Sequence, residues 1–188
     1  MENLMARSDG QTARFEVALG DYILGCTPDG LPPLFDEDSQ RAGLVEKFAL
    51  DEEDLCCLTV SRSGEPWPFL VVAQGFAPAG WGFEPGLLLI PEAKRLFVGA
   101  GERIIAYDLA VPRRLWLDSA YGGFYAWAQH GDVVVMSAEL ELAAWKVSGE
   151  KLWTTSVEPP WWYRVDCETL RLDVMGDVRQ FPLLSGPR

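Results

Sequence analysis

The chain has 188 residues, 28 acidic against 16 basic side chains, and a formal net charge of −12 at pH 7. Its 48% apolar content, with eight tryptophans and nine phenylalanines, excludes a disordered chain and predicts a folded unit with a sizeable core. The acidic balance argues against nucleic acid, whose phosphates require clustered Lys and Arg, and against an anionic membrane surface.

The negative charge is concentrated at one end of the sequence. Residues 1–54 contain 13 acids and four bases, an excess of 13 − 4 = 9 of the twelve charges, whereas residues 55–188 are nearly neutral. We therefore expect an acidic N-terminal segment over 1–54, packed on a main domain over 55–188. No secretory or membrane-spanning stretch is evident in the sequence, which favours a cytoplasmic protein.

The acidic segment contains three features. Residues 15–19 and 21–26 predict a β-hairpin, and the apolar residues of 39–49 predict a short amphipathic helix. The run Asp36, Glu37, Asp38 lacks the alternating ligands and glycine turn of a calcium loop. We expect it to form part of an acidic face that meets a basic partner.

The main domain contains a repeat of 37 to 38 residues. Trp116 and Trp153 occupy equivalent places 37 residues apart, and so do Gly64 and Gly101. Gly, Pro, Asp and Ser divide the repeats into short apolar runs, which is typical of strands joined by tight turns. The predicted strands are 55–60, 68–74, 87–91, 95–100, 103–109, 113–118, 124–129, 132–138, 140–147, 151–157, 162–166, 169–175 and 178–183. The repeat predicts an all-β fold of antiparallel four-stranded units, a small or partial β-propeller.

Two segments carry a family resemblance. Ala106-Tyr107-Asp108-Leu109 followed by Leu115-Trp116, and Ala144 through Trp153, resemble the ending Ala-x-Asp-x-x-Thr-Gly-Lys-x-x-Trp of quinoprotein-type propeller repeats. The resemblance covers three to four blades and implies that Trp116 and Trp153 dock one blade on the next. Pro112 and Lys146 depart from the pattern, standing where Gly and Asp are expected. The chain is too short for a quinoprotein ring of about eight blades, so we expect no cofactor.

The sequence singles out no catalytic or metal site. His130 is the only histidine and lies in a predicted turn, where a solvated role is expected. The pair Gly99 and Gly101 lacks the third glycine of a dinucleotide fingerprint and is read as turn residues. The four cysteines lack metal-ligand spacing and are expected to be buried and reduced. We expect no enzymatic activity and no metal.

Aromatic residues at predicted connections between repeats are the candidate binding residues. Glu158 precedes two prolines and Trp161, Trp162 and Tyr163, and Trp81 lies in a second aromatic loop. Rigid aromatic side chains on loops suit recognition, although the same rings could fill the space between sheets.

Three functional hypotheses follow. The first is a non-enzymatic cytoplasmic interaction protein that binds a basic protein partner through the rim aromatics and the acidic face. The alternative is a small-molecule or sugar-binding protein, with or without hydrolysis, in which Glu158 or Asp166 assists the tryptophans. A third is a homodimer in which two chains complete a larger ring.

Overall fold

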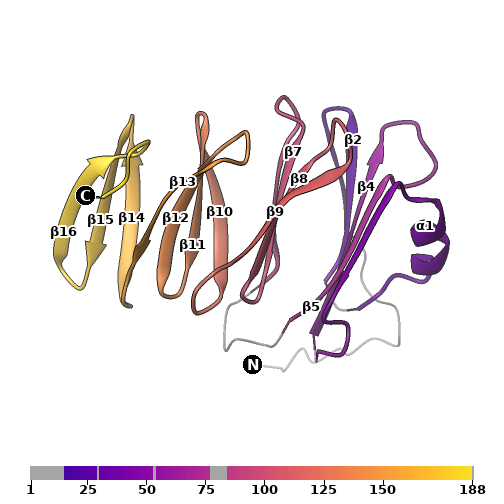
Figure 1. The fold of residues 1–188 in the computed structure, drawn as a ribbon, viewed down its shortest axis with the longest axis horizontal. Helices are drawn as coiled ribbons and strands as arrows, with labels where there is room; N and C mark the ends of the chain where they lie inside the picture. Colours follow the sequence, from indigo (N-terminus) through magenta and orange to yellow (C-terminus); the bar gives the residue numbers. More distant parts are fainter. Residues whose placement is uncertain (1–14, 29, 53, 77–83, 188) are drawn as a thin grey trace, which may run out of the picture.

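The computed structural model describes residues 15–28, 30–52, 54–76 and 84–187. Within these ranges the chain forms four β-sheets, here called sheets A to D in chain order, and one short helix. Figure 1 shows the sheets side by side in a row, with sheet A and sheet D at opposite ends.

Sheets B and C are four-stranded antiparallel units with the same up-and-down order. Sheet B comprises β6 (Gly86–Ile90), β7 (Arg95–Ala100), β8 (Arg103–Asp108) and β9 (Arg113–Ser119). Sheet C comprises β10 (Phe124–His130), β11 (Val133–Ala138), β12 (Glu141–Lys146) and β13 (Lys151–Ser156). The predicted strands of both repeats are confirmed, and so is the all-β architecture of a partial propeller.

Sheet D follows the same plan with three strands in the described part of the chain. These are β14 (Trp161–Asp166), β15 (Thr169–Val174) and β16 (Asp177–Pro182), paired antiparallel in that order. Leu170 and Leu172 point into the core while Arg171 and Asp173 do not, which is the predicted alternation.

Sheet A departs from the repeat. It comprises β1 (Phe15–Leu19), β2 (Tyr22–Thr27), β3 (Leu44–Phe48), β4 (Asp54–Arg62) and β5 (Leu70–Phe76), in the order β1-β2-β4-β5-β3. The predicted hairpin of β1 and β2 is confirmed, and so is the middle hairpin of β4 and β5. Residue 54 begins β4, so the boundary predicted there divides a sheet whose strands hydrogen-bond across it.

The predicted helix over 39–49 is wrong. The helix α1 occupies Phe35–Arg41, and the following residues form β3, which pairs in parallel with β5. Leu44, Val45 and Phe48 fit the spacing of a helix face, but Leu44 and Val45 lie opposite Leu70 and Val71 of β5. Pairing between residues 26 apart in sequence has overridden the local pattern.

Apolar faces between neighbouring sheets form three successive cores. Leu58, Leu70 and Val72 of sheet A pack against Leu96 and Ile105 of sheet B. Comparable clusters fill the interfaces between sheets B and C and between sheets C and D. Each sheet is therefore stabilised mainly by burial against its immediate neighbours.

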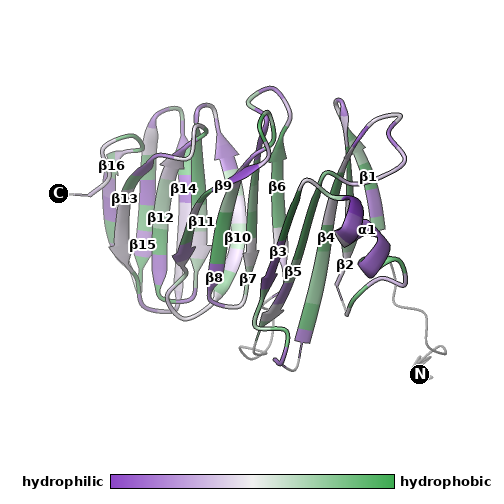
Figure 2. Cartoon of the chain, turned by 45° about the vertical axis from the view of Figure 1, so that its right-hand side comes forward, coloured by the Kyte–Doolittle hydropathy of each residue, from purple (hydrophilic) through white to green (hydrophobic). Residues whose placement is uncertain are grey.

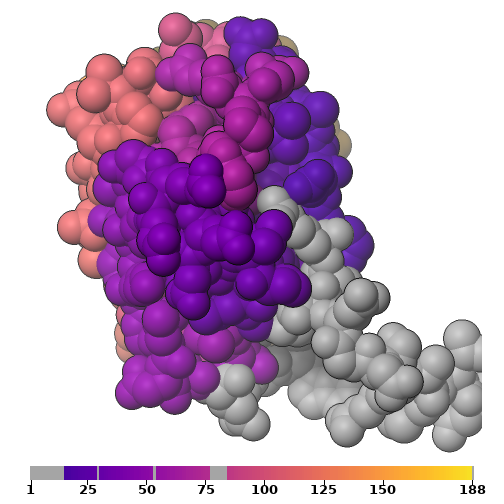
Figure 3. All heavy atoms as spheres, turned by 90° about the vertical axis from the view of Figure 1, so that its right-hand side faces the viewer, coloured from indigo at the N-terminus to yellow at the C-terminus, as the bar shows by residue number. Residues whose placement is uncertain are grey.

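The outer face of sheet A is covered by α1. Phe35 packs with Cys57, Val71 and Ala73. The rest of the helix is hydrophilic (Figure 2), and the N-terminal part of the chain forms this end of the molecule (Figure 3). Within the described ranges, no helix combines the length and apolarity that a membrane crossing requires.

Candidate functional site

The aromatic residues predicted from the sequence line a pocket between sheets C and D. This rim pocket has a volume of about 380 Å³ and is lined by Tyr125, Ser137, Pro159, Pro160, Trp161, Trp162 and Tyr163. Tyr125 belongs to β10 and the other aromatic residues to β14, so the pocket joins two repeats. The run of aromatic residues therefore fills part of the interface between sheets C and D, and part of it remains exposed to solvent.

The rings of the rim pocket differ in how firmly they are held. The indole Nε1 of Trp161 donates a hydrogen bond to the Glu139 carbonyl at 2.9 Å, and its ring stacks on Tyr163 with centroids 6.4 Å apart. Trp162 is 50% exposed and Tyr125 is 40% exposed. Trp161 and Tyr163 thus form the wall between the sheets, and Tyr125 contributes a more exposed ring. Trp162 lies on the opposite face of β14, where the Arg171 guanidinium is 5.8 Å from its ring centroid.

Acidic groups lie beside the rim pocket. Burial and the nearby Glu139 carboxylate raise the pKa of Tyr125, and burial raises the pKa of Tyr163. Both hydroxyls therefore remain protonated at neutral pH. Glu158, one residue before the two prolines, is exposed.

Other predicted site residues lie elsewhere. Asp36, Glu37 and Asp38 form the first turn of α1 at the opposite end of the row, so the fold does not join them to the rim aromatics (Figure 1). Asp36 and Glu37 are exposed, whereas Asp38 is buried. Trp81 lies outside the described residues.

The two tryptophans assigned to docking each reach the next sheet. Trp116 Nε1 donates to the Gly149 carbonyl at 2.7 Å, and Trp153 Nε1 donates to the Leu183 carbonyl at 2.6 Å. A Cβ at Gly186 would lie 2.4 Å from Trp153 Cγ, so the chain beyond β16 passes directly over this ring. These contacts give both tryptophans a structural role at successive interfaces.

His130 is placed at an interface and does not have the solvated position expected of it. Its ring meets Tyr163 edge-on with centroids 6.4 Å apart, and its buried Nε2 has no hydrogen-bond partner among the described residues. Burial lowers its pKa below 6.5. The ring is thus partly buried beside Tyr163, at the edge of the interface between sheets C and D.

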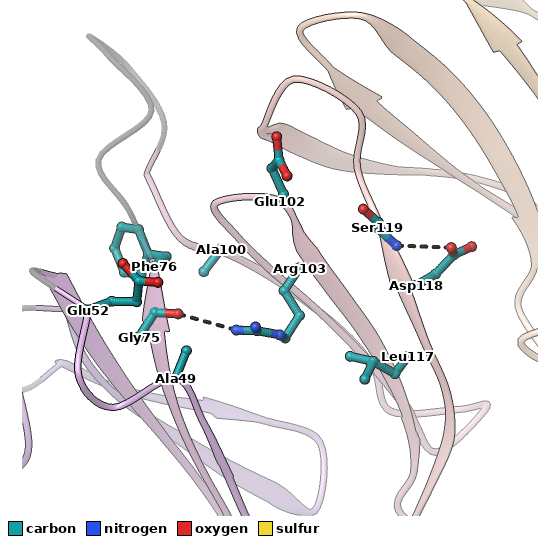
Figure 4. A pocket seen from close by; sticks show the side chains of 10 residues that line it. All are labelled: Ala49, Glu52, Gly75, Phe76, Ala100, Glu102, Arg103, Leu117, Asp118 and Ser119. Carbon is teal, nitrogen blue, oxygen red and sulfur yellow. Dashed lines mark hydrogen bonds between the residues drawn. The ribbon is translucent and has the colours of Figure 1, made fainter.

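A second cavity was not predicted. This groove, which we call the Arg103 groove, lies between sheets A and B and has a volume of about 630 Å³. Its lining, shown in Figure 4, comprises Ala49, Glu52, Gly75, Phe76, Ala100, Glu102, Arg103, Leu117, Asp118 and Ser119. The lining comes from several strand ends and turns that are distant in sequence, so no local motif could have predicted the groove.

Arg103 crosses this groove from β8 toward β5 (Figure 4). Its guanidinium donates to the Gly75 carbonyl at 3.2 Å and lies 5.3 Å from the Phe48 ring centroid. A Cβ at position 75 would lie 1.7 Å from the Ala49 carbonyl oxygen, so the turn before β4 can approach β5 only over glycine. That approach places Ala49 and Glu52 on the wall of the groove.

The groups needed for a metal site do not come together in the described ranges. No cluster of three or more His, Cys, Asp or Glu side chains is found there. Cys56 and Cys57 are buried as predicted, whereas Cys26 is half-buried and Cys167 is exposed, which corrects the expectation that all four thiols are buried.

The known structures named below resemble this chain at low sequence identity. No protein-family model and no curated protein sequence matches this chain. Among solved structures, Hsv2 from Kluyveromyces lactis is similar at 11% identity over 52% of this chain and 32% of its own, with a TM-score of 0.30. BamB from Moraxella catarrhalis is similar at 12% identity over 94% of this chain and 60% of its own, with a TM-score of 0.47. This chain therefore spans less than two thirds of either structure.

Proposed function

We propose that this chain is a non-enzymatic interaction protein for a basic protein partner, and that the rim pocket receives a Lys or Arg side chain of that partner. The observation that carries the proposal is the lining of one pocket by four aromatic residues, among which the Tyr125 side chain is 40% exposed. The negative face of an aromatic ring attracts a cation, with about 0.5–2 kcal/mol for each good contact.

The surroundings of the pocket support a cationic ligand. Glu139 acts electrostatically on Tyr125, and Glu158 is exposed next to Pro159. The whole chain carries a net charge of −12, which favours encounter with a basic partner. Neutral prolines and tryptophans make up the rest of the wall, so they would contact the methylene groups of the partner's side chain.

The acidic face of α1 acts separately from this contact. Sheets that pack face to face lie about 10 Å apart, so three spacings separate sheet A from sheet D by roughly 30 Å. Salt screens exposed charges over about 8 Å at physiological ionic strength. We infer that Asp36 and Glu37 speed association or meet a second part of the partner, while the rim pocket supplies the local affinity.

The scaffold fits the quinoprotein-type repeat that the two motifs resemble. Trp116 and Trp153, the last residues of those motifs, make corresponding contacts with the next sheet. We infer that the chain is a cofactor-free member of that repeat class, which serves as a binding scaffold in the cytoplasm.

The test compares two probes that differ only in charge. N-acetyl-arginine amide is titrated against the protein beside N-acetyl-citrulline amide, which has nearly the same shape but no charge, and tryptophan indole signals are followed by NMR. We expect the arginine probe to perturb the indole signal of Trp161, which lines the pocket, and to bind more tightly than the citrulline probe. Tyr125→Ala should weaken its binding by roughly three- to tenfold. Phe15→Ala, which removes an exposed ring at the other end of the row, is the matched control.

The same titration separates the sugar-binding alternative. The exposed face of Trp162 also suits a pyranose ring, but the Asp166 carboxylate is paired with Arg164 at the other end of β14 and does not line the pocket. Equal binding of both probes would contradict the proposal that the pocket binds a cationic side chain. Saturable binding of a neutral oligosaccharide at Trp162 would establish the sugar alternative.

A further inference from the structure

The Arg103 groove holds opposite charges that do not neutralise one another. In the part of the chain that the structure describes, no carboxylate oxygen lies within ion-pair distance of the Arg103 guanidinium, although three carboxylates line the same groove. Asp118 is paired with Lys151 at 2.7 Å. Glu52 and Glu102 form no hydrogen bond or ion pair through their side chains within the described ranges.

The Arg103 side chain is fixed but not saturated. The Gly75 carbonyl and the Phe48 ring hold the guanidinium in place, and they use only part of its five N–H donors. Planar donors of this kind match a carboxylate, which can accept two parallel hydrogen bonds. The groove therefore contains a positive charge whose position is fixed before a ligand binds.

The rest of the groove lining consists of acidic and apolar side chains. Glu52, on the side of sheet A, and Glu102, at the turn before β8, supply anionic poles (Figure 4). Phe76, Leu117 and Ala100 supply apolar wall, and the volume of about 630 Å³ lies within the range of small-molecule sites. A ligand with only one sign of charge would meet a like charge somewhere in this groove.

We propose that the Arg103 groove binds a small zwitterion with an apolar side chain, of the free amino acid or short peptide class. The ligand carboxylate pairs with Arg103, its ammonium group pairs with Glu52 or Glu102, and its side chain lies against Phe76 and Leu117. This site is independent of the rim pocket, because it lies between a different pair of sheets.

The test uses ligands in which one charge at a time is removed. L-leucine and L-leucyl-L-leucine are titrated calorimetrically, beside N-acetyl-leucine, which lacks the ammonium group, and leucine amide, which lacks the carboxylate. We expect at least one of the two zwitterions to bind and each capped leucine to bind about tenfold more weakly or not at all. Leucine and the dipeptide distinguish the free amino acid from the peptide.

Two variants test which side chains pair with the carboxylate and the ammonium group of the ligand. Arg103→Gln is expected to bind leucine and leucine amide equally, because the partner of the carboxylate is gone. The double variant Glu52→Gln, Glu102→Gln is expected to bind leucine and N-acetyl-leucine equally. Glu65→Gln, in the exposed turn between β4 and β5, should behave like the unaltered chain.

Several outcomes would overturn the proposal. These are the absence of binding by both zwitterions, a capped ligand that binds as well as its parent, or continued rejection of N-acetyl-leucine by the double glutamine variant. If Arg103→Gln does not fold, the capped ligands and the glutamate variants still decide the question. The arginine probe of the rim pocket gives an independent result in either case.

Discussion

His130 was expected to be a solvated turn residue, but its ring is partly buried, and this changes its pKa. As the only histidine in the chain, it is the one side chain with an ordinary pKa near 6.5. The structure places its ring against Tyr163 and lowers its pKa by burial. The unfolded chain consequently binds a proton more readily than the folded chain just below pH 6.5.

This difference predicts a pH-dependent stability. Because the unfolded state takes up more protons, the free energy of unfolding should fall as the pH is lowered from about 7 to about 5.5. His130→Gln should remove that part of the dependence. Urea unfolding of both chains at several pH values measures it, and identical profiles would contradict the assignment to His130.

Cysteine reactivity is a second prediction at the residue scale. Burial raises the pKa of Cys56 to about 12, with smaller effects from Cys26 and Cys57, so its reactive thiolate is suppressed. Cys167 is exposed in the turn between β14 and β15. A maleimide should therefore modify Cys167 first in the folded protein, and Cys56 and Cys57 only after unfolding. Cys167→Ser should abolish the fast phase, and rapid labelling that persists in that variant would oppose this order.

At the scale of elements, the tryptophan contacts between sheets are expected to determine stability. Trp153 donates to the Leu183 carbonyl in a buried position, and Phe cannot replace that donor. Trp153→Phe should lower the free energy of unfolding by about 1–3 kcal/mol, because the carbonyl loses its partner inside the protein. Trp162→Phe, at an exposed ring, should change it by less than about 0.5 kcal/mol. Thermal or urea unfolding measures both, and equal effects would argue against a structural role for Trp153.

The same elements show what the sequence could predict. Strand positions in sheets B, C and D follow from local alternation and turn residues, because each pairs with its neighbour in sequence. Even the departure at Lys146 has a local explanation: Asp108 pairs with Arg95, and Lys146 in the next repeat pairs with Glu150. Each repeat therefore pairs the charge at this position with a side chain of opposite sign, taken from a different place in the repeat.

Long-range pairing and packing account for what the sequence did not predict. β3 was predicted as helix because its partner, β5, lies beyond β4 in the chain. Gly99 was read as a turn residue, but it lies within β7, where a Cβ would come within 2.5 Å of the Phe124 ring. The residues of the rim pocket that lie on β14 were predicted from one run in the sequence. Tyr125 and the Arg103 groove could not be predicted in this way, because their neighbours come together only when the sheets pack.

At the scale of the whole molecule, the two ends of the row differ. α1 covers the outer face of sheet A with Phe35, while the outer face of sheet D presents Trp162, Arg164 and Arg171 to solvent. A ring made from two chains would need both faces, and the face of sheet A is occupied. The ring-completing homodimer would therefore require α1 to leave the face of sheet A.

A linear row of sheets also predicts how the molecule opens. Because each sheet is buried mainly against its neighbours, a defect at one end should not propagate to the other. Leu172 is fully buried between sheets C and D, and Leu172→Ala should cost about 2–5 kcal/mol locally. Hydrogen exchange should then accelerate in β14, β15 and β16 while β4 and β5 keep their protection.

A substitution at the other end of the row is the control for this prediction. Leu70→Ala, at the interface of sheets A and B, should accelerate exchange in β4 and β5 and leave β15 protected. If either substitution accelerates exchange evenly across all four sheets, the row unfolds as one cooperative unit. In that event the sheets would be coupled more strongly than their nearest-neighbour packing implies.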